Sequence, residues 1–97
     1  MRLTFHPSVA SDIARVMAHY QQVGGASLAD EFYAELRSCF AKALEAPRNY
    51  PIHSGELRRV TLDRFPYHFL FRIDGDDVRV LVVRHHRRRP TLGTTRR

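Results

Sequence analysis

The chain has 97 residues, 43% of them hydrophobic, and a formal net charge of +6. It is too short for two domains with adequate cores and too apolar to be disordered. The charge favours an acidic partner, either nucleic acid or an acidic protein segment, over a membrane surface. Cys39 is the only cysteine, which excludes an internal disulfide.

The first predicted elements are a short strand and a helix. Leu3 and Phe5 alternate with polar residues up to Pro7, which predicts a strand over residues 2–5. Ser8 is the expected N-cap of the helix. The helix has an apolar stripe with helical spacing, formed by Val9, Ile13, Val16, Met17 and Tyr20. No apolar run resembles a leader or a membrane span, so we expect a cytoplasmic protein.

A second helix is predicted from about Ser27 to Ala46, where Pro47 stops it. Its apolar stripe consists of Leu28, Phe32, Leu36, Phe40 and Ala43. Gly24–Gly25 separates the two helices, which should therefore form a hairpin. Residues 47–56 contain two prolines, an asparagine and a glycine, and are predicted to be an irregular loop.

Three more strands are predicted, over residues 57–62, 66–73 and 78–84, and Asp74–Asp77 reads as the turn between the last two. The order β-α-α-β-β-β predicts an α+β fold with a helical hairpin packed on one face of a small antiparallel sheet. Residues 1–90 should form a single domain. Residues 91–97 lack periodicity and are expected to be a flexible C-terminal tail.

The last strand is apolar and runs directly into His85-His86-Arg87-Arg88-Arg89-Pro90. Strand pairing should bring this basic segment close to basic residues of the two preceding strands. The predicted partner-binding residues are Arg58, Arg59, His68, Arg72, Arg84, His85, Arg87 and Arg88. Two simpler interpretations stay open: arginines along a strand can lie on a solvated face, and His85 can be a hydrogen-bonding structural residue instead of an acid or base.

Metal and cofactor chemistry is not indicated. Adjacent residues of an extended chain point to opposite faces, so His85 and His86 are poor candidates for one metal ion. The sequence contains no nucleotide-binding or nucleophile motif, and we expect no cofactor. Helix carboxylates such as Asp12 fall on predicted polar faces, where solvation is the default explanation.

The strand motifs carry a resemblance to a known group of proteins. Leu57–Arg59, Phe65–Arg72 and Val80–Val83, followed by His85–Pro90, occur in an order that resembles the RelE/ParE toxin superfamily. The similarity extends from Phe5 to Pro90. It implies a toxin of a bacterial type II toxin-antitoxin module, neutralised in a hetero-oligomer by a cognate acidic antitoxin. An acidic tail of such an antitoxin could pair its carboxylates with the predicted partner-binding arginines.

The resemblance implies one of two activities. RelE-like members cleave messenger RNA on the ribosome, whereas ParE-like members bind and poison DNA gyrase. Nuclease members commonly use a Lys/Arg-rich sheet face and a late tyrosine, but Lys42 lies in the second predicted helix and no tyrosine follows the last strand. The His85–Pro90 ending is similar to the ParE-like pattern, so we expect gyrase inhibition by binding.

The alternative is a metal-independent endoribonuclease of the RelE type. It would use Arg58, Arg72, His85 and Arg88. A direct nucleic-acid-binding module is a third interpretation, which rests on net charge alone.

Overall fold

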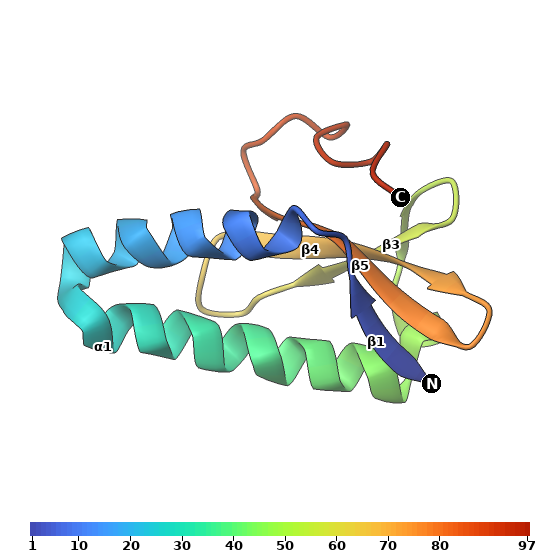
Figure 1. Ribbon diagram of the computed structural model, residues 1–97, viewed down its shortest axis with the longest axis horizontal. Helices are drawn as coiled ribbons and strands as arrows, with labels where there is room; N and C mark the ends of the chain where they lie inside the picture. The colour runs from blue at the N-terminus through green and yellow to red at the C-terminus, as the bar shows by residue number, and fades with distance from the viewer.

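The helix and the sheet form two layers in the computed structural model, which describes residues 1–97 (Figure 1). The elements are β1 (Arg2–Phe5), α1 (Val9–Glu45), the 3₁₀ turn η1 (Pro47–Asn49), β2 (Ile52–Ser54), β3 (Leu57–Thr61), β4 (Tyr67–Asp74) and β5 (Asp77–His85). α1 covers one face of the sheet. The predicted α+β class, with helices on one face, is confirmed.

α1 is a hairpin of two helical arms that reverse direction at Gly25 (Figure 1). Gly25 has φ +77° and ψ −176°, a conformation that glycine adopts readily because it has no Cβ. The two predicted helices and the glycine turn between them are therefore present. α1 has 37 residues, but no part of it is both long and apolar enough to cross a bilayer.

The five strands form one sheet in the order β1-β5-β4-β3-β2. β3, β4 and β5 are antiparallel neighbours, as predicted, and β2 adds a further antiparallel strand beside β3. The prediction of a wholly antiparallel sheet is wrong for β1, which runs parallel to β5 with Leu3 opposite Val78, so the sheet is mixed. The predicted irregular loop at residues 47–56 is wrong in part, because it contains η1 and β2. β2 has three residues, of which only Ile52 is apolar, so the sequence gives no alternation to detect.

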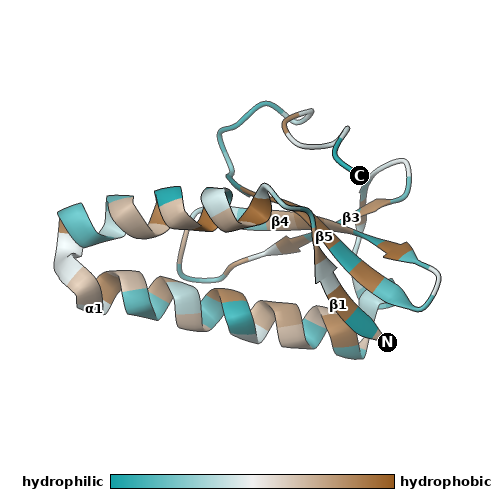
Figure 2. Ribbon diagram, viewed as in Figure 1, coloured by the Kyte–Doolittle hydropathy of each residue, from teal (hydrophilic) through white to brown (hydrophobic).

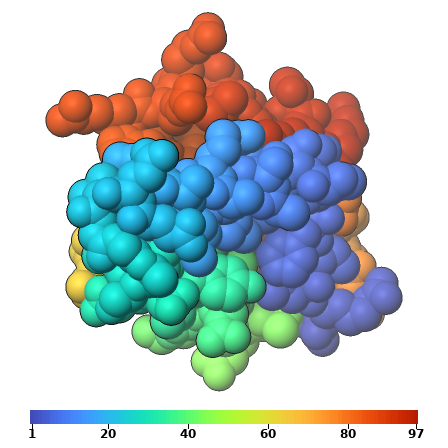
Figure 3. Space-filling model, turned by 60° about the vertical axis from the view of Figure 1, so that its left-hand side comes forward, coloured from blue at the N-terminus to red at the C-terminus, as the bar shows by residue number.

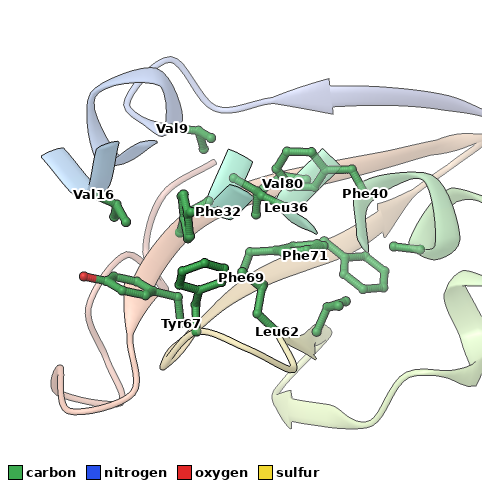
Figure 4. Packing of buried hydrophobic residues seen from close by; sticks show 14 of the residues in the cluster. Val9, Val16, Phe32, Leu36, Phe40, Leu62, Tyr67, Phe69, Phe71 and Val80 are labelled. Carbon is green, nitrogen blue, oxygen red and sulfur yellow. The ribbon is translucent and has the colours of Figure 1, made fainter. Parts of the chain in front are cut away.

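The core lies between α1 and the sheet (Figure 4). Both predicted helical stripes face it, and Phe32, Leu36, Phe69 and Phe71 are fully buried. Hydrophobic and hydrophilic residues alternate along both arms of α1 (Figure 2). Each buried phenylalanine contributes about 2 to 3 kcal/mol to folding by leaving water.

A bulge in β5 changes which residues face α1. Leu70 pairs with Val82 and Phe71 pairs with Val80, so Leu81 has no partner on β4. Leu81 and Val82 consequently face the same side of the sheet, away from α1. Residues after the bulge have the opposite orientation from the one that strict alternation predicts.

Residues 91–97 fold back over the outer face of the sheet, the face opposite α1 (Figure 1). Figure 3 shows this C-terminal segment lying along the first arm of α1. Below the segment lies a small apolar cluster of Leu57, Leu70, Leu81 and Val82. The flexibility of this tail in solution stays a prediction.

Candidate functional site

Arg84, on the outer face, is buried without a carboxylate partner. Its Nε donates to His68 Nε2 at 2.9 Å, and its Nη2 lies 3.2 Å from His53 Nε2. Its Nη1 donates, at 2.8 to 2.9 Å, to the carbonyl oxygens of Arg89, Pro90 and Leu92. Arg84 therefore fixes the path of the chain after β5.

His68 is a buried structural histidine. Because its Nε2 accepts from Arg84, the neutral ring carries its proton on Nδ1, which donates to Nδ1 of His86 at 2.9 Å. Burial, reinforced by the positive charges of Arg59 and Arg84, lowers the pKa of His68 to about 3. Burial also lowers the pKa of His86. His68 is thus uncharged at neutral pH and does not face solvent.

Asp12, in the first turn of α1, connects three parts of the fold. Its Oδ2 accepts from the backbone N–H of Val83 at 3.1 Å and from Arg96 Nη1 at 2.7 Å. Its Oδ1 accepts from Arg15 at 2.9 Å and from Arg96 Nη2 at 3.2 Å. The expectation that Asp12 is solvated is wrong. β1 ends at Phe5, so the N–H of Val83 has no strand partner, and the carboxylate takes that place.

A cavity of about 440 Å³ lies between the first arm of α1, the ends of β4 and β5, and the tail. Four arginines and one aspartate line it, a formal net charge of +3: Arg15, Arg84, Arg88, Arg96 and Asp12. Three of the predicted partner-binding residues, Arg84, His85 and Arg88, contribute to its wall together with Tyr67. The structure thus gathers positive charge at this end of the sheet.

The predicted convergence of basic residues is only partial. Arg59 pairs with Leu70 of the outer face, which also carries His68, Arg72 and Arg84. Arg58 instead pairs with Phe71, whose side chain packs under α1, so Arg58 is on the opposite face from Arg72.

The remaining basic residues have individual roles. Arg58 donates to the carbonyl of Tyr50 at 2.7 Å and thereby holds the loop before β2. Arg72 lies 3.5 Å from Asp74. Arg87 and Arg88 are exposed and make no side-chain hydrogen bond or ion pair. The four residues of the alternative nuclease site are therefore not together. Arg58 and Arg72 lie on opposite faces of the sheet, His85 is the last residue of β5, and Arg88 lies beyond the sheet.

An apolar groove of about 650 Å³ lies on the other side of the first arm, between β1 and the two arms of α1. Phe5 and Tyr33 line it and are 42% and 40% exposed. His6 and Arg37 supply its polar groups. β1 is also an edge strand, so its outer backbone groups have no strand partner. The sequence reasoning missed this groove, although Tyr33 is an aromatic outside the predicted stripe.

These features define a small basic α+β domain with a helical hairpin on a five-stranded sheet and an arginine-rich segment after the last strand. The family model described as "ParE toxin of type II toxin-antitoxin system, parDE" matches residues 3–90, so the chain belongs to that family. The family resemblance read from the strand motifs is confirmed.

The fold is also that of a solved structure of the chromosomal ParDE TA system from P. aeruginosa. The two chains are 24% identical, with a TM-score of 0.75, over 88% of this chain and 95% of the other. No curated protein sequence matches the chain. Residues 91–97 lie beyond the part that the family model matches.

Proposed function

We propose that the protein is the toxin of a type II toxin-antitoxin module and that it inhibits DNA gyrase by binding in the cytoplasm. The observation that carries the proposal is the family match over residues 3–90, which includes the basic segment after β5. In that segment Arg87 and Arg88 are exposed and unpaired, so they are available to an acidic surface of a partner.

Two features support binding over RNA cleavage. Arg58 and Arg72 lie on opposite faces of the sheet, so they are poorly arranged to surround one scissile phosphate. In addition, Nη1 of Arg58 donates to the backbone carbonyl oxygens of Arg48 and Tyr50, before β2, and is therefore not free to bind a phosphate. Of the nuclease set, only His85 and Arg88 line one cavity.

A gyrase supercoiling assay with purified, antitoxin-free protein tests the proposal. We expect loss of supercoiling and accumulation of cleaved DNA at micromolar toxin. Arg87→Glu should weaken inhibition roughly tenfold, because a reversed charge replaces attraction by repulsion. Arg48→Glu is the matched control, because Arg48 is exposed in η1, away from the basic segment.

Full supercoiling at micromolar toxin would count against gyrase as the target. Mapping transcript ends on translating ribosomes tests the RelE-like alternative in parallel. Cleavage that disappears in His85→Ala, with the fold intact by circular dichroism, would replace the gyrase proposal by the nuclease one.

The cognate antitoxin is proposed to bind with an amphipathic acidic segment in the apolar groove. The groove offers apolar area at Phe5 and Tyr33 and positive charge at Arg37, and the chain as a whole is basic. Burial of exposed aromatic residues is a common source of affinity in protein interfaces. The edge strand β1 can in addition pair with an extended segment.

Binding of the antitoxin to groove variants tests this site. Tyr33→Asp should weaken the complex roughly tenfold to a hundredfold, because it removes a central aromatic contact and adds a charge that repels an acidic segment. Ile52→Asp is the control for the added charge, because Ile52 is 52% exposed on β2 at the other edge of the sheet. Equal affinities for the two variants would exclude the groove.

A further inference from the structure

Tyr67 is nine-tenths buried, yet its hydroxyl has no hydrogen-bond partner. The ring is fixed in the core, with its centroid 5.5 Å from that of Phe32 and 6.1 Å from that of Tyr20. Its oxygen points away from the labelled core side chains (Figure 4), and Tyr67 lines the 440 Å³ cavity. No buried side-chain polar atom of the protein lacks a partner, so this unpaired hydroxyl is accessible from the cavity and can donate to a bound group.

His85 provides a second free donor in the same cavity. Its Nδ1 accepts from the backbone N–H of Arg87 at 3.0 Å, so the neutral ring keeps its proton on Nε2. Nε2 has no partner within the protein. The His85 ring lies 5.0 Å from that of Tyr67, edge to face, because the bulge in β5 turns His85 toward the side of α1.

Arg88 provides the third donor. Its guanidinium forms no hydrogen bond or ion pair with the protein, and it lines the cavity. Arg88 is near enough to Tyr67 for its charge to oppose the rise in pKa that burial causes in the phenol. The charge, the phenol and the imidazole therefore converge on one space.

The other charged groups of the cavity are already paired. Both oxygens of Asp12 accept hydrogen bonds, from Arg15, Arg96 and the N–H of Val83. Arg84 is bound to carbonyl oxygens and histidines. The carboxylate is thus not free to compete for Arg88, and the cavity keeps an excess of positive charge.

We propose that this cavity binds a small phosphorylated molecule, whose phosphate accepts hydrogen bonds from the Tyr67 hydroxyl, His85 Nε2–H and Arg88. Three donors from separate side chains match the several oxygens of a phosphate better than the two of a carboxylate. The volume is within the range of small-molecule sites, and the apolar walls at Val16 and Val83 suit a non-ionic remainder such as a nucleoside.

The site shares only Arg88 with the basic segment proposed to face gyrase, and its other two donors, Tyr67 and His85, have no part in that proposal. It lies apart from the apolar groove, and none of its donors is shared with the groove lining. Leu92 and Arg96 form one wall of the cavity, and both lie beyond residues 3–90. This wall is therefore a feature of the chain's own C-terminal segment and not of the part matched by the family.

Titration of the full, ¹⁵N-labelled chain with inorganic phosphate and with adenosine monophosphate tests the proposal, with chloride holding the ionic strength constant. We expect saturable amide shifts at residues 67, 85 and 88, with sodium acetate binding more weakly. Tyr67→Phe keeps the ring and removes only the hydroxyl, and should weaken binding roughly tenfold, as for a lost hydrogen bond to a charged group. Arg88→Ala should weaken it at least as much.

Arg89→Ala is the matched control, because Arg89 is exposed in the same segment and does not line the cavity. Melting curves establish that each variant is folded. Absence of saturable shifts at millimolar phosphate and nucleotide would overturn the proposal. So would equal losses in Arg88→Ala and Arg89→Ala, which indicate diffuse charge attraction, or equal affinity for acetate, which indicates a site without preference for phosphate.

Discussion

Arg84 and His68 form a buried hydrogen-bonded pair, with Nε of Arg84 2.9 Å from Nε2 of His68. A guanidinium in this position remains charged, although burial lowers its pKa. Backbone carbonyls and imidazole nitrogens satisfy its donors in place of an acidic partner. The pair thus links the sheet to the segment that carries the exposed arginines.

Removing the guanidinium should therefore destabilise the fold. Arg84→Met keeps much of the side-chain volume but leaves buried acceptors, including Nε2 of His68, without a donor. We expect the free energy of unfolding to fall by about 2 to 3 kcal/mol. Urea denaturation measures the change. Arg48→Met, at an exposed position, should stay within about 0.5 kcal/mol of the parent, and an equal loss in both variants would contradict the role of Arg84.

The same pair predicts a pH dependence of stability. His68 has a pKa of about 3 in the folded protein and about 6.5 when unfolded, so between these values the unfolded chain binds more protons. Stability should be fully present above pH 6.5 and decrease as the pH falls toward 3. The largest slope for one such group is about 1.4 kcal/mol per pH unit.

Urea midpoints at several pH values between 7 and 4 check this dependence. His68→Gln retains an oxygen that can accept from Arg84 and does not titrate, so it should flatten the curve. His19→Gln changes an exposed histidine of α1 and should leave the slope unaltered. An unchanged slope in His68→Gln would exclude His68 as the titrating group.

The elements that the sequence predicts correctly are those with a repeated apolar pattern. The stripes from Val9 to Tyr20 and from Leu28 to Ala43 recur over several turns, and Gly25 separates them with a conformation suited to glycine. The burial of Asp12 could not be predicted from the sequence, because it depends on a hydrogen bond from the N–H of Val83. Val83 is 71 positions away, and no local sequence pattern indicates such a contact.

The site was predicted less well because a single bulge determines its geometry. Alternation along β5 cannot reveal that Leu81 lacks a partner, yet this residue reverses the orientation of Arg84 and His85. Arg84 joins His68 on the outer face as a result, and His85 joins Tyr67 on the side of α1. The sequence identified the basic residues but not the two groups into which they divide.

Asp12 and Arg96 should be energetically coupled. Their contact buries a carboxylate that is 3% exposed, so each partner stabilises the charge of the other. A double-mutant cycle with Asp12→Asn and Arg96→Gln should give a coupling of about 1 to 3 kcal/mol. The asparagine retains an oxygen for the N–H of Val83, so the cycle reports mainly on the ion pair.

The exposed pair Arg2–Asp77 is the control for that cycle. It has a similar separation of 3.1 Å, but the Arg2 side chain is 80% exposed. Its coupling should be much smaller, because solvent screens both charges. Couplings of equal size in the two cycles would show that burial does not strengthen the Asp12 contact.

Gly93 determines whether the C-terminal tail can lie on the sheet. It has φ +79°, and a Cβ at this position would lie 2.6 Å from Cβ of Val82. Gly93→Ala should therefore release the tail and remove one wall of the cavity. Amide hydrogen exchange of Leu92, Thr94 and Arg96, which donate to carbonyls within the segment, should become fast in the variant.

Gly55→Ala separates steric overlap from backbone strain. Gly55 also has a positive φ, +54°, but nothing lies within 4 Å of a Cβ built there. Both variants incur about 1 kcal/mol of backbone strain, whereas only Gly93→Ala should accelerate exchange in the tail. Unprotected exchange of the same amides already in the parent protein would instead establish the flexible tail predicted from the sequence. In that case the wall formed by Leu92 and Arg96 would be only transiently in place.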